Sequence, residues 1–303
     1  MTTPRAYQPP PALSPGDRVA AIAPASSFDR PSFEAGLALI AARYQVSYGA
    51  GLYEQQRYLA GTDERRFAEL AAALGDPAIR GVFCVRGGYG ATRLLGRLAA
   101  LPPAPPKPLV GFSDITALHL WLQSHGTVSV HGPVLTQLPL LPAATCVRLF
   151  ALLESGTPPP PLRAVETYVD GVAEGPLLGG SLSMLTRVLG TPYMPDLEGA
   201  ILLLEDVGER PYRLDRMWTH LTLAGAFARV RGIALGTFVN CEERNADYRA
   251  ADVLRDLAAA TGLPCAAGFP IGHGDLNEPV PLGARVRLDA GARTLTFLEG
   301  AVA

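Results

Sequence analysis

The sequence contains little cysteine, and the cysteines it has are not grouped. The four among 303 residues are far apart, and no C-x-x-C pair occurs: Cys84, Cys146, Cys241 and Cys265. This spacing argues against a cysteine-ligated zinc site or a redox dithiol. It favours a reduced, cytoplasmic protein, and we expect no metal.

The sequence also lacks a block of like charge and a long apolar run. Its net charge is -2 and it has no dense Lys/Arg segment, which argues against nucleic acid or an anionic membrane as a partner. No apolar run approaches the roughly 18 to 20 residues of a membrane span. The first 26 residues have no apolar segment before their prolines, so no secretory signal is expected. We therefore expect a small ligand.

What the N-terminal half does contain is short apolar runs alternating with amphipathic stretches. Strands are expected within 18–26, 81–85 and 108–112, and helices over 33–43, 62–76 and 90–101. Thr62 and Asp63 are cap candidates for the second helix, and Gly75 ends it. This alternation predicts an α/β domain whose parallel sheet is covered on both faces.

The alternation stops at a run of four prolines within 154–163. Because such a run fits neither a helix nor a central strand, it predicts a linker. We expect an N-terminal domain over 1–157, a proline-rich linker over 158–169, and a smaller strand-rich domain over 170–303. The latter should contain one or two helices and a hairpin turning at Ala290 and Gly291.

Ser113 lies at the corner between an expected strand and an expected helix, in "PLVGFSDITALHLWL". One interpretation is a helix N-cap, with Asp114 favourable to the helix dipole. The other is a nucleophile on a strained strand-to-helix turn, where the next backbone N–H faces an oxyanion. The segment matches only the first half of G-x-S-x-G, so both interpretations stay open.

The glycine-rich stretch "VRGGYGATRLL" follows the preceding strand and should lie at the same sheet edge. It could be a plain glycine turn. A dinucleotide-binding loop is disfavoured, because Arg93 stands where G-x-G-x-x-G needs its third glycine. Alternatively, Gly87 or Gly88 could offer a backbone N–H to an oxyanion, together with that of Asp114.

A serine nucleophile needs a base, and the chain has five histidines. Three of them, His119, His125 and His220, fall in helical patterns and are expected to be packed or solvated. His131 ends an expected strand and could line a pocket or be structural. His273 lies between glycines in a loop that neither helix formation nor packing explains, so it is the preferred base.

A carboxylate commonly orients such a histidine, and Glu205 and Asp206 end a strongly apolar run. They could simply mark a strand that reaches water. A carboxylate at the end of a buried strand is, however, rigidly placed and partly desolvated, as an orienting group should be. The order of the catalytic residues would then be Ser, Glu, His.

Six segments in this order resemble the LD-carboxypeptidase family, the serine peptidases that include murein tetrapeptide carboxypeptidase and the microcin immunity peptidase. They are "RGGYGATRLL", "GFSDITALH", "HGP", "GGSLSMLTRVLGTPYMP", "LLLEDVGERPYRLDRM" and "PIGH". The resemblance implies an N-terminal domain like that of class I glutamine amidotransferases, a C-terminal domain, and an active site in the cleft between them.

The resemblance further implies a cytoplasmic homodimer without cofactor that removes the terminal D-alanine of murein tetrapeptides in peptidoglycan recycling. Ser113, Glu205 and His273 would be catalytic, and the N–H groups of Asp114 and Gly88 would hold the oxyanion. The expected substrate-binding residues are Arg86, which suits a free carboxylate, together with Tyr89 and His131.

The sequence departs from the family at two places. Residues 179–182 read Gly-Gly-Ser-Leu where Gly-Gly-Asn-Leu is common, and the stretch between Pro161 and Leu177 is short. The short stretch favours the murein branch over a peptidase that inactivates a peptidyl-nucleotide antibiotic. Two other hypotheses are a non-enzymatic binding protein with Ser113 as a cap and, disfavoured by Arg93, a dinucleotide-dependent oxidoreductase.

Overall fold

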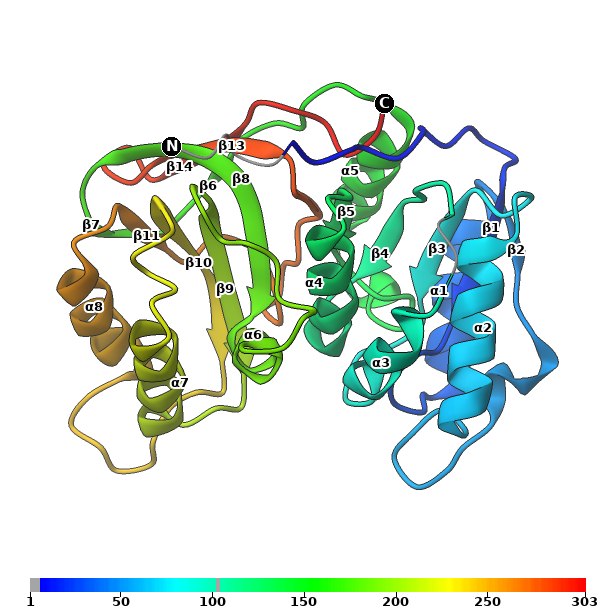
Figure 1. Ribbon diagram of the computed structural model, residues 1–303, viewed down its shortest axis with the longest axis horizontal. Coiled ribbons are helices and arrows are strands. Elements are labelled where there is room, and N and C mark those ends of the chain that lie inside the picture. Colours follow the sequence, from blue (N-terminus) through cyan, green and yellow to red (C-terminus); the bar gives the residue numbers. More distant parts are fainter. Residues whose placement is uncertain (1–5, 102–103) are drawn as a thin grey trace.

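Two β-sheets stand side by side and carry helices on their faces (Figure 1). The structure is a computed structural model that describes residues 6–101 and 104–303. The expected α/β fold with a parallel N-terminal sheet and a strand-rich second part is confirmed.

The first sheet has six strands in the order β12-β5-β4-β3-β1-β2. The strands are β1 (Arg18–Ile22), β2 (Gln45–Ser47), β3 (Gly81–Cys84), β4 (Leu109–Gly111), β5 (Ser129–His131) and β12 (Val280–Leu282). Strands β1 to β5 are parallel, and β12 is antiparallel to β5. The strand order reverses direction at β1 and β3, and ligands of open parallel sheets gather at the carboxyl end of such a point.

Helices cover both faces of this sheet. Side chains of α1 (Arg30–Ala41) and α5 (Ala143–Glu154) share one core cluster, and those of α2 (Asp63–Gly75), α3 (Leu95–Leu98) and α4 (Thr116–Ser124) share another. Helix α2 begins as expected, because Thr62 Oγ1 accepts the Arg65 N–H at 3.2 Å. The helix expected over 90–101 is shorter, a 3-10 turn (Ala91–Leu94) followed by α3.

The second sheet has eight strands in the order β6-β14-β13-β8-β9-β10-β11-β7. The strands are β6 (Leu162–Arg163), β7 (Glu166–Val169), β8 (Val172–Ser181), β9 (Ile201–Val207), β10 (Gly232–Val239), β11 (Cys265–Ala267), β13 (Arg285–Asp289) and β14 (Thr294–Phe297). The central strands β8 to β11 are parallel. The β13–β14 hairpin turns at Ala290 as expected, because the Arg293 N–H donates to its carbonyl oxygen.

The strand β9 explains why its sequence reads as one continuous apolar run. Leu202 and Leu204 pack with α6 (Leu182–Val188), α7 (Pro211–Leu223) and α8 (Ala250–Thr261), whereas Ile201 and Leu203 face a separate core with β13 and β14. A parallel strand covered on both faces is apolar at every position. The described second part thus contains three helices rather than the expected one or two.

Two parts of the chain lie elsewhere in the structure than the expected domain division places them. The stretch 158–169, expected as a linker, contains β6 and β7, which are edge strands of the second sheet. The chain also returns to the first sheet through β12, and Ala301 and Val302 are buried in the first sheet's core. These placements depend on contacts between segments that are far apart in the sequence, and a local sequence pattern does not predict such contacts.

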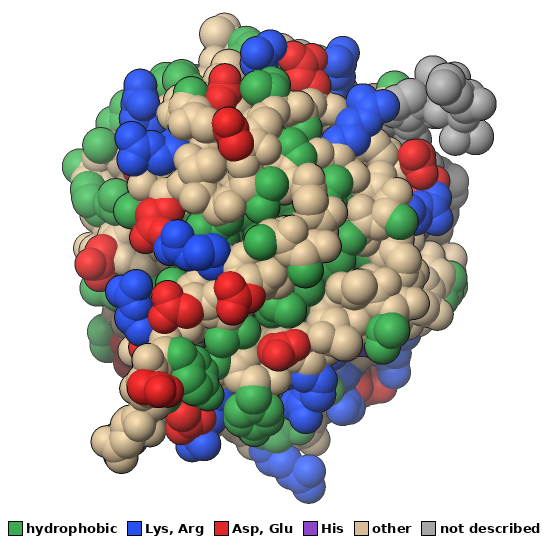
Figure 2. All heavy atoms as spheres, turned by 90° about the vertical axis from the view of Figure 1, so that its left-hand side faces the viewer, with side chains coloured by type: hydrophobic (Ala, Val, Ile, Leu, Met, Phe, Trp, Pro, Cys, Tyr) green, Lys and Arg blue, Asp and Glu red, His purple; other side chains and the backbone are tan. Residues whose placement is uncertain are grey.

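The surface shows no single dominant charge on the face that carries α7 and α8. Figure 2 shows arginine and acidic side chains interspersed there. None of the helices in the described ranges is both long and apolar enough to cross a bilayer.

Candidate active site

Ser113 occupies a strained turn directly after β4. Its φ is +64°, a left-handed conformation that costs a non-glycine residue roughly 1 to 2 kcal/mol. Ser113 is the first residue of a 3-10 turn (Ser113–Ile115) whose N-cap is Phe112, and the N-cap of α4 is Ile115, so the N-cap interpretation of Ser113 is wrong.

The Ser113 hydroxyl hydrogen-bonds to the His273 imidazole, which in turn hydrogen-bonds to the buried Glu205 carboxylate. Ser113 Oγ lies 3.0 Å from His273 Nε2, and His273 Nδ1 lies 2.6 Å from Glu205 Oε2. The carboxylate can only accept, so Nδ1 carries the proton and Nε2 is left to accept the serine proton. The structure therefore brings together the three residues singled out from the sequence, which are separated by up to 160 positions along the chain.

Burial and charge set the protonation of this chain of groups. Glu205 is fully buried, whereas Ser113 and His273 are partly exposed. Burial alone would raise the pKa of Glu205, but the facing imidazoles of His273 and His131 lower it to about 2. Burial opposes the charge on His273, but its hydrogen bond to Glu205 and the carboxylate charge raise its pKa. An ionised carboxylate and a basic imidazole result.

Glu205 and Asp206 point in different directions, as neighbours on a strand must. Asp206 accepts the N–H groups of Ser183 at 2.6 Å and Val207 at 2.9 Å. Burial, aided by the Glu205 charge, raises the pKa of Asp206 to about 6. Of the two carboxylates considered, only Glu205 hydrogen-bonds to His273.

The glycine loop (residues 86–90) lies directly against Ser113 at Gly87. A Cβ added to Gly87 would lie 2.8 Å from Ser113 Cβ and 3.1 Å from its Oγ. The Tyr89 N–H is taken by Ser26 Oγ at 3.0 Å. Within the described residues no acceptor takes the N–H of Gly88 or Asp114, so these two donors are available to a bound group.

The Asp114 side chain has a role that the sequence did not indicate. It is buried, and its carboxylate accepts the Ala91 N–H at 2.7 Å, tying the glycine loop to the serine turn. Burial raises its pKa to about 6. From the other side, buried Arg66 donates to the carbonyl oxygens of Gly90 at 2.9 Å and Pro24 at 2.6 Å. Both charged groups hold the loop in place.

The loop that carries His273 is anchored to the first sheet's side of the molecule. Asn277 is fully buried; it accepts the Gly272 N–H at 3.0 Å and donates to Gln137 Oε1 at 2.9 Å. Gly272 itself has φ +111°, and a Cβ there would lie 2.4 Å from Glu205 Oε2. Only glycine allows the backbone to pass so close to the carboxylate. Neither Asn277 nor Ser26 was identified from the sequence.

The three residues expected to bind substrate fall into two groups. Arg86 and Tyr89 are exposed beside the glycine loop, and Arg86 Nη1 donates to the Ser27 carbonyl oxygen at 2.5 Å. His131 is fully buried against the Phe112 ring, with centroids 5.8 Å apart. The expectation that His131 contacts substrate is therefore wrong.

The serine at the departure from the family pattern takes on other contacts. Ser181 Oγ accepts the Met184 N–H at 3.4 Å and so caps α6, and the Ser181 N–H donates to Thr116 Oγ1 at 3.1 Å. Ser181 thereby joins the start of α6 to α4. An asparagine at this position is not required to hold these elements together.

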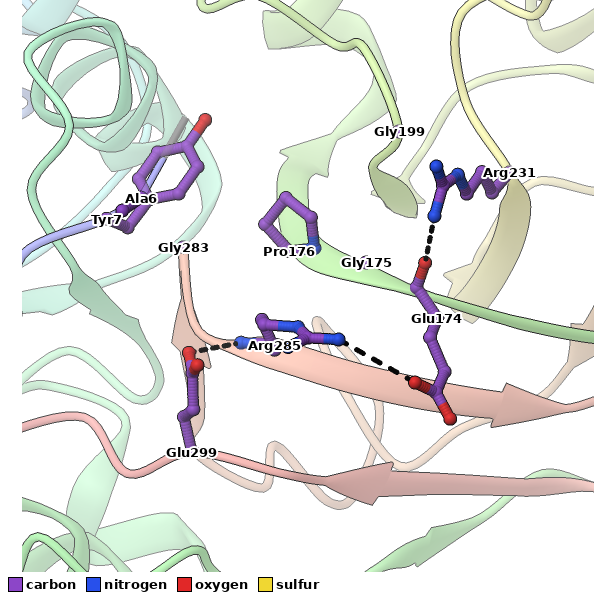
Figure 3. Close-up of a pocket in the computed structure, with 10 residues that line it drawn as sticks. All are labelled: Ala6, Tyr7, Glu174, Gly175, Pro176, Gly199, Arg231, Gly283, Arg285 and Glu299. Atoms are coloured by element: carbon purple, nitrogen blue, oxygen red, sulfur yellow. Dashed lines mark hydrogen bonds and ion pairs between the residues drawn. The ribbon is translucent and has the colours of Figure 1, made fainter. Parts of the chain in front are cut away.

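A separate pocket of about 290 Å³ lies near the start of β8, at the end of the strand away from Ser181 (Figure 3). Its charged side chains pair with groups of the pocket itself: Arg285 Nη2 lies 3.7 Å from Glu174 Oε2, and Arg231 Nη1 donates to the Glu174 carbonyl oxygen at 3.4 Å. Glu174 is about 23 Å along the strand from Ser181, at 3.3 Å per residue. The pocket therefore takes no part in the Ser113 site.

Two family models and several named relatives match this chain. Residues 19–132 match the family model described as the LD-carboxypeptidase N-terminal domain, and residues 174–288 match that of the C-terminal domain. The murein tetrapeptide carboxypeptidase of Pseudomonas aeruginosa is 37% identical over 90% of this chain and 93% of its own length.

Solved structures share the whole fold. The muramoyltetrapeptide carboxypeptidase of Oxalobacter formigenes has a TM-score of 0.80 at 29% identity, covering 94% of this chain and 99% of that one. MccF in complex with glutamyl sulfamoyl guanosine has a TM-score of 0.85 at 21% identity, covering 97% and 99%. At that lower identity the second likeness concerns the fold alone.

Proposed function

This chain belongs to the LD-carboxypeptidase family, a family of peptidases, and from that premise we propose that it is a serine carboxypeptidase acting on murein tetrapeptides. It cleaves the L-to-D bond before the terminal D-alanine. The observation that carries the proposal is the hydrogen-bonded chain from Ser113 through His273 to Glu205, with Ser113 on a strained turn.

The proposed reaction begins when His273 Nε2 takes the proton of Ser113 Oγ. The oxygen attacks the carbonyl carbon before the D-residue, and the Gly88 and Asp114 N–H groups stabilise the oxyanion. The C–N bond then breaks, D-alanine leaves with the proton held on His273, and water cleaves the acyl-enzyme with His273 again as base. Glu205 keeps Nδ1 protonated throughout.

An exopeptidase must also bind the free carboxylate of its substrate, and we assign this to Arg86. Its guanidinium is exposed beside the glycine loop, and planar guanidinium matches carboxylate geometry. Exposed Tyr89, whose ring centroid lies 5.9 Å from that of Tyr58, supplies an adjacent aromatic surface.

The location and assembly that we propose rest on different grounds. A cytoplasmic role in peptidoglycan recycling is supported by four free cysteines, three of them buried. A homodimer is proposed on the family resemblance alone, and sedimentation equilibrium of the purified protein tests it.

The substrate assignment is tested with L-Ala-γ-D-Glu-meso-diaminopimelate-D-Ala. We expect release of D-alanine, measured with a D-amino acid oxidase assay. The same peptide ending in L-alanine is the matched control and should stay intact, because the proposed site is specific for an L-to-D bond. Hydrolysis of aspartyl sulfamoyl adenosine with no action on the tetrapeptide would replace the murein proposal with the antibiotic-inactivating one.

Gly87→Ala is expected to lower kcat roughly 100-fold, the size of effect that a displacement of about 1 Å produces at a reacting group. The added methyl would press on Ser113. Gly75→Ala, at the end of α2 with nothing within 4 Å of the added atom, is the control and should keep full activity. Equal activity of both variants would show that the loop does not confine Ser113.

A further inference from the structure

Glu205 uses only one of its two carboxylate oxygens toward His273. The other, Oε1, has no hydrogen-bond partner within the described residues, although the side chain is fully buried. An ionised carboxylate oxygen buried without a donor is costly, so a polar group that faces Oε1 is a candidate partner.

That group is the imidazole of His131. It is fully buried, neither ring nitrogen has a hydrogen-bond partner among the described residues, and Nε2 lies 3.9 Å from Glu205 Oε1. His131 belongs to β5 of the first sheet and Glu205 to β9 of the second, so the contact crosses between the two sheets. Two unpartnered buried polar groups thus face each other.

We propose that His131 is a positioning residue for Glu205: its Nε2–H faces Oε1 and holds the carboxylate in the orientation in which Oε2 meets His273. The inference rests on the proposed function and deepens it, because it adds a second imidazole behind the catalytic carboxylate. The 3.9 Å separation is about 1 Å longer than a hydrogen bond, so a small side-chain rotation completes it.

The surroundings leave His131 few other partners. The ring of Phe112 packs against it, and His119, with its ring centroid 6.4 Å away, already bonds to Ser129 Oγ and the Gly111 carbonyl oxygen. Burial lowers the pKa of His119 to about 3, so that ring stays neutral. The charged or titratable groups near the His131–Glu205 contact are therefore His273, His119 and Asp206.

The lowered pKa of Glu205 agrees with this arrangement. Burial acts to raise the pKa, and His131 and His273 together bring it to about 2. With only His273 present, one oxygen of the carboxylate would lack any facing donor, and the side chain could rotate about its last bond. A second donor from the opposite sheet restricts that rotation.

The test replaces His131 and observes the His273 Nδ1–H. His131→Leu removes the donor, His131→Asn keeps a polar group but shortens it out of reach, and His131→Gln restores a donor. In proton NMR we expect the strongly downfield His273 Nδ1–H resonance to move upfield or vanish in the first two variants and to persist in the third. With the tetrapeptide, kcat should fall roughly 10- to 100-fold in the loss variants while KM changes little.

His119→Gln is the matched control, because it alters a second fully buried histidine that does not face Glu205. It should keep the downfield resonance whatever its effect on stability. An unchanged resonance in whichever loss variant folds would overturn the proposal, as would equal loss in His119→Gln. The NMR readout needs no substrate, so it stands apart from any failure of the murein assignment.

Discussion

Ser113→Ala is expected to abolish hydrolysis, with kcat reduced by about 10⁶-fold, the loss measured when the serine of an unrelated protease triad is removed. The reason is geometric, because no other hydroxyl lies at His273 Nε2 in the described structure. The measurement is D-alanine release from the tetrapeptide. A serine-directed fluorophosphonate should label Ser113 in the native protein, as read by mass spectrometry, and label nothing in the variant.

The same position predicts a conflict between stability and activity. Since Ser113 has φ +64°, glycine should relieve strain there. Ser113→Gly is therefore expected to melt at or slightly above the temperature of the native protein while being inactive, and Ser113→Ala should melt no higher than Ser113→Gly. A clear destabilisation of Ser113→Gly in calorimetry would contradict the strain argument, and normal activity of Ser113→Ala would contradict the mechanism.

The fold was largely predictable because its signals are local. The apolar runs that became β3, β4, β9 and β10 are short and uninterrupted, as buried parallel strands are, and Thr62 marked the start of α2. Helix α1 begins three residues before the expected position, because Asp29 accepts the Ser32 N–H at 2.9 Å and Pro31 fits a first turn.

The placements that failed depend on long-range contacts. Nothing in the local pattern of 280–282 shows that β12 leaves the second sheet and pairs with β5. The proline run likewise conceals β6, since edge strands tolerate neighbouring prolines. The first concerns which sheet a segment joins and the second whether a segment is a strand at all, and tertiary packing decides both.

In the candidate site, residue types that suit catalysis were predictable, but the supporting contacts were not. Ser113, Glu205 and His273 stand at strand ends or between glycines, where sequence reasoning can single them out. His131 was expected to contact substrate but is fully buried. The sequence could not show this, because a histidine at the end of a strand carries no signal of which side of the sheet it faces. The Asp114 carboxylate was considered only as favourable to the helix dipole in the N-cap interpretation, yet it accepts the Ala91 N–H.

The site is consequently assembled across two sheets. Ser113 follows β4, Glu205 lies on β9, and the His273 loop is held to Gln137 through Asn277 and to Thr237, whose Oγ1 accepts the Gly274 N–H at 3.1 Å. The loop that carries His273 is thus held to residues on both sides of the contact between the sheets.

Glu205→Gln is expected to lower kcat by about 10⁴-fold, as carboxylate-to-amide replacement does in an unrelated serine protease. The amide can present its NH₂ to His273, which moves the imidazole proton to Nε2 and leaves no acceptor for Ser113. The acid limb of kcat/KM should also shift. In the native protein Glu205 raises the pKa of His273, so the acid limb of kcat/KM lies above the ordinary histidine value of 6.5. Without the Glu205 charge, the pKa of His273 falls and the acid limb moves to lower pH.

Stability should change with pH in a matching way. The folded pKa of Glu205 is about 2 against an ordinary 4.5, so its contribution to the free energy of unfolding is present above 4.5 and is lost as the pH falls toward 2. Glu205→Gln should lack this loss in urea unfolding between those pH values. Asp206→Asn is the matched control for the kinetic prediction, because the Asp206 carboxylate accepts the Ser183 N–H at the start of α6. If Asp206→Asn lost as much kcat and shifted the acid limb of kcat/KM as far as Glu205→Gln, the role assigned to Glu205 would be contradicted.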